Sequence, residues 1–152
     1  MKELKEQEIK HLEFIQAIIN RMNSNSFSIK GWAITIVSAL LALYANNSNV
    51  AYIFVAIVPS ILFWLLDSYY LQQERKFRGL YNDIVNCKKD IVCFSMPINE
   101  YKEGSYTLWS AFKSKTIAWL YGLTSALLLV LGLMLVYWED IVSMCNRICN
   151  SN

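Results

Sequence analysis

Three long apolar runs constrain this chain more than any other feature of its sequence. Residues 31–45, 50–66 and 116–138 contain no Asp, Glu, Lys or Arg and only scattered small polar side chains. An α-helix rises about 1.5 Å per residue, so roughly 20 residues are needed to cross the hydrocarbon core of a bilayer. The third run reaches this length alone, and the first two reach it with residues 27–30 and 67–71. The sequence therefore predicts an all-α membrane protein with three transmembrane helices.

Composition agrees with a membrane domain and limits what else the chain can contain. Of its 152 residues, 55% are hydrophobic and 17% are charged, whereas soluble domains have about 25% charged residues. This size allows one membrane domain and a modest element outside it. The predicted parts are an amphipathic N-terminal cytosolic helix (1–25), a transmembrane hairpin (26–71), a basic cytosolic segment that begins as a helical extension (72–115), a third transmembrane helix (116–138) and an extracytoplasmic tail (139–152).

The distribution of positive charge predicts the orientation in the membrane. All but one of the 14 Lys and Arg residues lie before the first apolar run or between the second and the third, and Arg147 is the exception. Short loops rich in Lys and Arg stay on the cytoplasmic side. We therefore expect the N-terminus and the middle segment in the cytoplasm and the C-terminus outside.

Residues 2–22 are expected to form an amphipathic helix. Their apolar residues recur at helical spacing, at Leu4, Ile9, Leu12, Ile15, Ile19 and Met22. The polar stretch 23–26 is expected to interrupt this helix, with Ser26 as the N-cap of the first membrane helix. The apolar stripe would lie in the lipid headgroups or pack against the same helix of other subunits. Several acidic residues nearby disfavour an anionic lipid surface and favour packing between subunits.

The first membrane helix carries small residues at a 4,3,4,3 spacing. They are Gly31, Thr35, Ser38, Ala42 and Ala45. A face of small residues lets helix backbones approach closely in a membrane. Two interpretations remain open: tight packing within one subunit, or a face that contacts other subunits and lines a pore with Thr35 and Ser38.

One acidic and one basic residue mark the same border of the first two apolar runs. Lys30 precedes the first run, and Asp67 follows the second. In an antiparallel hairpin these two residues come to the same level, and a carboxylate at that depth is unfavourable without a partner. The sequence predicts a Lys30–Asp67 pair, with separate contacts to the lipid headgroups as the alternative. Asp67 is expected to share a face with Ala56, Ser60 and Phe63.

The middle segment concentrates cations just outside the membrane. The second helix is expected to continue past Asp67, and the expected cationic residues are Arg75, Lys76, Arg78, Lys88 and Lys89. Arg pairs well with phosphate oxygens, and aromatic rings stack on bases, so these residues are candidates for binding an anionic ligand. The alternative is that they fix topology and contact anionic lipid. A short interfacial helix is expected at 106–112, anchored by Trp109.

The sequence offers little for catalysis. His11 is its one histidine, with no second metal ligand three or four residues away, and no glycine-rich phosphate loop or nucleophile elbow is present. We therefore expect no enzyme, no cofactor and no metal site.

Two strings in the first half of the chain carry a resemblance. They are N-S-F-x-x-K-G-W at residues 25–32 and D-x-Y-Y-L-x-Q-E-R-x-F-R at residues 67–78. With His11–Gln16, they resemble small multi-pass membrane proteins of bacterial anti-phage defence operons, the Hailong-type membrane effectors. The resemblance implies a homo-oligomer (such as a tetramer) in the bacterial inner membrane that conducts ions. It also implies control by an oligonucleotide from a partner nucleotidyltransferase.

The resulting hypothesis is a ligand-controlled ion channel that depolarises the cell in phage defence. Thr35 and Ser38 would line the pore, and Arg75, Lys76 and Arg78 would sense the ligand. One alternative is a non-conducting adaptor that recruits a cytosolic partner through residues 72–89. Another is a membrane subunit whose partner supplies the chemistry.

Overall fold

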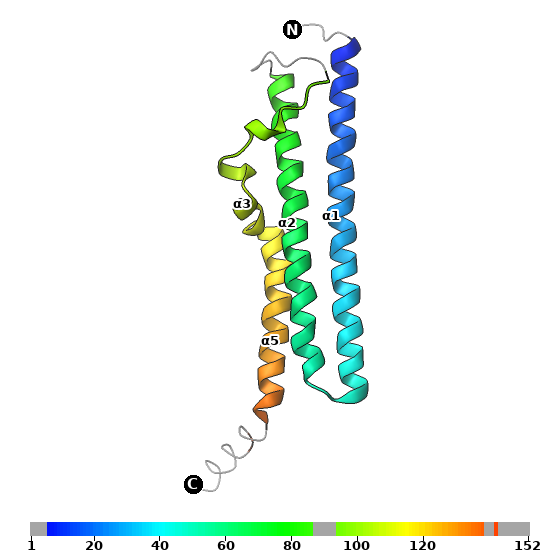
Figure 1. The fold of residues 1–152 in the computed structure, drawn as a ribbon, viewed down its shortest axis with the longest axis vertical. Helices are drawn as coiled ribbons and strands as arrows, with labels where there is room; N and C mark the ends of the chain where they lie inside the picture. Colours follow the sequence, from blue (N-terminus) through cyan, green and yellow to red (C-terminus); the bar gives the residue numbers. More distant parts are fainter. Residues whose placement is uncertain (1–5, 87–93, 139–141, 143–152) are drawn as a thin grey trace.

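The computed structural model describes residues 6–86, 94–138 and 142, and all regular structure in these residues is helical (Figure 1). Two long helices come first, α1 (Glu6–Asn47) and α2 (Ala51–Val85). The short turns η1 (Ile98–Glu100) and η2 (Gly104–Tyr106) and the helix α3 (Leu108–Phe112) follow. The last helix, here called the third span, consists of α4 (Lys115–Ile117), the π-helical turn η3 (Ala118–Gly122) and α5 (Leu123–Val136). The all-α prediction is confirmed.

The long helices lie side by side with α2 in the middle. α1 and α2 form an antiparallel hairpin, and α5 lies on the other side of α2 (Figure 1). In the turn between α1 and α2, the Asn49 side chain accepts a hydrogen bond from the Ala51 amide at 2.9 Å. α1 begins at one end of the molecule and α5 stops at the other, as three consecutive crossings require.

Three helices are long and apolar enough to cross a membrane: α1, α2 and the third span. Their outward faces expose large apolar side chains, such as Val58 on α2 (58% exposed) and Val130 on α5 (61% exposed). A soluble protein would bury such continuous apolar surface. Length, composition and exposure together suggest a multi-pass membrane protein.

α1 is one unbroken helix of 42 residues, so the predicted interruption at 23–26 is wrong. Asn and Ser lower helix propensity by less than about 1 kcal/mol each, and packing against α2 on both sides of the stretch outweighs this preference. The Ser28 hydroxyl donates to the carbonyl of Ser24 at 3.1 Å, within the same helix. Ser26 lies inside the helix and is buried, so its assignment as an N-cap is also wrong.

The amphipathic half of α1 packs on its own chain. Ile15 and Ile19 are buried against Phe77 and Leu80 of α2, in a cluster that Tyr101 completes. The expectations of a headgroup contact or a contact with the same helix of other subunits are therefore wrong for these residues. The reason is that α2 continues beyond the membrane segment beside α1, so the two helices cover each other along most of their length.

The segment from Ile98 to Phe112 returns along α2. Gln72 donates to the carbonyl of Tyr106 at 2.9 Å, and the Tyr101 hydroxyl donates to Asp83 Oδ2 at 2.8 Å. Burial, and next the hydrogen bond to Asp83, raise the pKa of Tyr101 above its usual value. The phenol therefore stays protonated and can keep donating to the carboxylate. The short helix predicted at 106–112 is present as α3, with the Thr107 side chain accepting from the Ser110 amide at its start.

Close contact between this segment and α2 depends on Gly79. A Cβ atom there would lie 2.7 Å from Tyr106 Oη and 2.9 Å from Tyr101 Cε1. We expect Gly79→Ala to lower the free energy of unfolding by about 1–3 kcal/mol, because the two rings must move. The measurement is denaturant unfolding in detergent micelles, with limited proteolysis of residues 98–106 as a local readout. Gly31→Ala is the matched control, since a Cβ at Gly31 meets nothing within 4 Å; equal effects of both variants would contradict the prediction.

Candidate site at the membrane boundary

The predicted pair between Lys30 and Asp67 is formed. Lys30 Nζ lies 2.7 Å from Asp67 Oδ2, and the two residues lie at the ends of the first two apolar runs. Asp67 is fully buried, while the Lys30 side chain is 24% exposed. The alternative, in which each side chain reaches the headgroups separately, is therefore wrong for Asp67.

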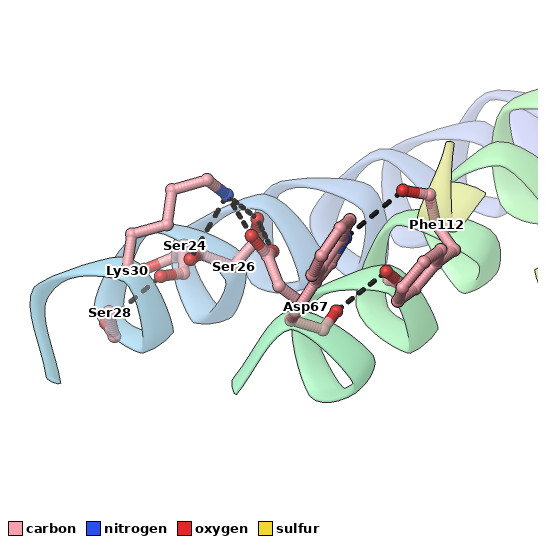
Figure 2. A network of polar contacts seen from close by, with 8 residues as sticks. Ser24, Ser26, Ser28, Lys30, Asp67 and Phe112 are labelled. Atoms are coloured by element: carbon pink, nitrogen blue, oxygen red, sulfur yellow. Dashed lines mark hydrogen bonds and ion pairs between the residues drawn. The ribbon is translucent and has the colours of Figure 1, made fainter. Parts of the chain in front are cut away.

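Ser26 completes the cluster as a third member. Its hydroxyl donates to Asp67 Oδ1 and accepts from Lys30 Nζ at 2.6 Å (Figure 2). Ser26 and Lys30 are four residues apart on α1, so both side chains point to the same part of α2. Sequence reasoning missed this role, although the i,i+4 spacing to Lys30 was a usable signal.

Aromatic rings connect α3, α2 and the third span beside this cluster. Trp64 stacks on Phe112 with ring centroids 4.1 Å apart, and Trp64 Nε1 donates to the Phe112 carbonyl at 3.2 Å. The ring centroids of Trp64 and Tyr121 are 6.5 Å apart. Tyr121 is buried, and its hydroxyl lies beside the Asp67 carboxylate. α1, α2 and the third span therefore meet at the level of Asp67.

The small-residue stripe of α1 is not used for packing within the subunit. Its five members are all exposed, namely Gly31, Thr35, Ser38, Ala42 and Ala45. The buried face of α1 includes Ile29 and Ala33, and at about 100° per residue Gly31 points about 160° away from both. The interpretation as packing within one subunit is therefore wrong, because α1 faces α2 with its opposite side.

The stripe extends beyond the membrane segment. Ala17, Ser24 and Ser28 continue the same spacing toward the N-terminus, with Arg21 between them, and all four residues are exposed. Sequence reasoning missed this extension because it treated 23–26 as a break. Two hydroxyls of the stripe donate to their own helix: Ser28 to Ser24, and Thr35 to the Gly31 carbonyl at 2.9 Å. Such internal bonds let hydroxyl side chains lie in an apolar environment.

The predicted ligand-binding cations are partly engaged by their own chain. Arg75 donates to the carbonyl of Ser105 at 3.1 Å and to the Ser110 hydroxyl at 3.3 Å. Arg78 pairs with Glu74 at 2.7 Å, and its side chain is 58% exposed. Lys76 is half-buried on the same helix. Lys88 and Lys89 lie outside the described residues. Arg75 therefore holds the returning segment against α2, a role that its sequence context did not reveal.

The part of the chain that the structure describes contains no group of three or more His, Cys, Asp and Glu residues placed to hold a metal ion. His11 is buried there, with its ring 5.7 Å from that of Phe94. Its sequence surroundings had indicated a charged helix surface instead.

Comparisons of the chain with protein-family models, curated proteins and solved structures found no match. The function is therefore inferred from the residues of this chain. The molecule is a small helical protein with three helices that are apolar and long enough to cross a membrane.

Proposed function

We propose that several copies of this chain associate through the small-residue stripe of α1 and form an ion channel. The observation that carries the proposal is the exposure of this stripe, in which Gly31, Thr35 and Ala42 lie on the side of α1 opposite α2. In a membrane, apolar burial does not distinguish a neighbouring helix from lipid, so close backbone approach decides which faces associate. A face of Gly, Ala, Ser and Thr permits that approach.

The arrangement of the helices favours a pore shared between subunits. α2 packs against both α1 and α5 (Figure 1), and the third span also contacts α1, where Ala33 lies in one buried cluster with Ile117 and Tyr121. Copies arranged around an axis would place α1 toward the centre, with Thr35 and Ser38 near its wall. The positive charge of the N-terminal half and the middle segment supports a cytoplasmic position for the end of the molecule where α1 begins.

The proposal also includes control of the channel by an anionic ligand. Arg75 uses a carbonyl and a hydroxyl of its own chain, and Arg78 has Glu74 as a competing partner. A guanidinium has five donors, so both side chains keep donors for phosphate oxygens. An oligonucleotide bound here would act on the segment that Arg75 holds against α2. The resemblance to anti-phage effectors adds the context, in which opening depolarises an infected cell.

Ion flux in liposomes tests the channel. We expect the purified protein to dissipate a potassium gradient across the liposome membrane, in the absence or the presence of a mixture of short synthetic oligonucleotides. Ser38→Leu should reduce this flux at least about tenfold, because a leucine side chain narrows the wall and removes a hydroxyl. Ala126→Leu on the third span is the matched control and should leave the flux unchanged. A wild-type protein that stays impermeable in both conditions favours the non-conducting adaptor and contradicts the channel.

A further inference from the structure

Two lysines and two tryptophans lie exposed around the connection between α3 and the third span. They are Trp109 on α3, Lys113 just after it, and Lys115 and Trp119 at the start of the third span, here called the boundary patch. Both lysines are exposed, and the two tryptophans are 63% and 70% exposed. α3 lies beside α2, directly before the third span begins (Figure 1).

The boundary patch lies at the edge of the membrane segment. The carbonyl of Phe112 accepts a hydrogen bond from Trp64 Nε1 at 3.2 Å, and Trp64 precedes Asp67 by three residues, inside the second apolar run. The third apolar run begins at residue 116, directly after Lys115. Tryptophan rings favour the headgroup layer of a bilayer, and lysine side chains near helix ends extend into it. The four side chains therefore lie at the level of the lipid headgroups.

Stacked rings fix the position of Trp109. Its ring stacks on that of Phe112 with centroids 5.6 Å apart and planes at 1°, and Phe112 stacks on Trp64 of α2. Lys113 Nζ lies 4.6 Å from the centroid of the Trp109 ring. A cation over the face of an aromatic ring is attracted to it. Through these rings, α2 therefore orients an ammonium group at the surface of the molecule.

The two lysines have no acidic partner in this part of the chain. Residues 104–138 contain no Asp or Glu, and neither Lys113 nor Lys115 forms an ion pair with a described residue. Hydrogen bonds between an ammonium group and a phosphate are charge-assisted and therefore stronger than those between neutral groups. Basic residues close to a membrane attract anionic lipid headgroups. The boundary patch thus has the charge to bind an anion.

An apolar groove of about 410 Å³ lies next to the lysines, on the exposed side of the third span. Trp119 and Leu123 line it, and Lys115 precedes Trp119 by four residues, so it lies one turn nearer the boundary on the same face. A soluble anion has a group for the lysines but none for the groove. A phospholipid has both, because it carries a phosphate and an acyl chain close together.

We infer that the boundary patch binds one anionic phospholipid, with the phosphate on Lys113 and Lys115 and part of an acyl chain in the groove beside Trp119. The inference goes beyond the proposed channel and does not depend on it. These residues lie outside the α1 stripe and are not among the proposed ligand-binding cations. A non-conducting adaptor has the same patch, and a channel can exist without a bound lipid.

Native mass spectrometry of the full chain in a mild detergent tests the inference. The protein is mixed with equal amounts of phosphatidylglycerol and phosphatidylcholine that have the same acyl chains, because choline cancels the charge of the phosphate. We expect one phosphatidylglycerol per subunit, retained with at least about tenfold preference over phosphatidylcholine. The double variant Lys113→Gln with Lys115→Gln should reduce this preference to less than about twofold.

Lys10→Gln with Lys102→Gln is the matched control, since it removes the same charge from two exposed positions away from the boundary. Lys10 lies about 30 Å from Lys30 along α1, and Lys102 follows Tyr101, which bonds to the far end of α2. This control should keep the wild-type preference. Equal loss in both double variants would show a general effect of charge and would overturn the inference, as would a wild type that retains both lipids equally.

A soluble phosphate separates a lipid site from a site for any anion. A large excess of sn-glycerol 1-phosphate should leave phosphatidylglycerol bound, because the soluble compound has no acyl chain for the groove. Displacement of the lipid would also overturn the inference. All four substituted lysines are exposed, so the variants should fold like the wild type, which circular dichroism checks. If the double variant does not fold, each single variant replaces it and should lose part of the preference.

Discussion

Lys30→Met is expected to lower the free energy of unfolding by about 3–5 kcal/mol, because it leaves the Asp67 carboxylate buried with the Ser26 hydroxyl as its hydrogen-bond donor. Asp67 is fully buried at the edge of the apolar segment, so water cannot replace the lost ammonium group. The measurement is denaturant unfolding in detergent micelles, followed by circular dichroism.

A solvent-exposed ion pair in the same chain, with the same N···O distance, provides a control. Lys10 and Glu6 also lie 2.7 Å apart, but their side chains are 62% and 81% exposed. We expect Lys10→Met to change stability by less than about 1 kcal/mol. The double variant Lys30→Met with Asp67→Leu should recover most of the loss, because it removes the unpaired charge. Equal effects of Lys30→Met and Lys10→Met would contradict the prediction that the buried pair stabilises the fold.

Ala42→Leu is expected to dissociate the proposed assembly without unfolding the subunit. Ala42 lies in the exposed stripe of α1, and a leucine there keeps the backbones of two copies apart. Overpacking of about 1–3 kcal/mol at one contact corresponds to a roughly 5- to 150-fold weaker association. The measurement is the distribution of subunit number in lipid bilayers at several protein-to-lipid ratios.

Ala126→Leu separates the two helix faces that could associate. Ala126 is exposed on the third span, where Gly122 gives it a small neighbour four residues away. We expect this variant to assemble like the wild type. The reverse result, with Ala126→Leu dissociating the copies and Ala42→Leu leaving them together, would move the interface to the third span and refute the role of α1. A wild type that is monomeric at every ratio would refute self-association altogether.

Local sequence patterns were sufficient to predict the parts of the fold that follow from where charged residues occur in the sequence. Runs without charge predicted the three apolar helices, since few positions in a membrane helix tolerate an ionised side chain. The Lys30–Asp67 pair followed from two residues at the same border of a hairpin. The exposed apolar face of α2 and the short helix at α3 agree with the same reasoning.

Local patterns gave wrong predictions where a side chain forms its hydrogen bond with a helix distant in sequence. Ser26 belongs to a polar stretch that resembles a helix cap, but its hydroxyl is used by Asp67, 41 residues away in sequence. The preference of Ser and Asn for caps is small, and the packing of α1 on α2 decides the backbone instead. Neither the exposure of the α1 stripe nor the burial of Ile15 could be predicted from periodicity, because periodicity defines a face without naming its partner.

The position of the segment from Ile98 to Phe112 could not be predicted from the sequence, for a related reason. Its position depends on single contacts between residues 18–35 positions apart, such as Tyr101 with Asp83 and Arg75 with Ser105, and on the space that Gly79 leaves. No periodic pattern encodes such contacts. The π-helical turn at Tyr121 also has no sequence signal that distinguishes it from a regular helix turn.

The continuity of α1 has a mechanical consequence. A straight helix of 42 residues is about 63 Å long, and a helix without a break bends little over that distance. Lys30, which pairs with the buried Asp67, lies about 36 Å from the start of this helix and about 26 Å from its end. A tilt of roughly 10° about Lys30 would displace the start of α1 by about 6 Å and its end by about 4–5 Å, in opposite directions. Because α1 has no hinge, a displacement of its N-terminal part, residues 6–29, also displaces its apolar part, residues 31–45.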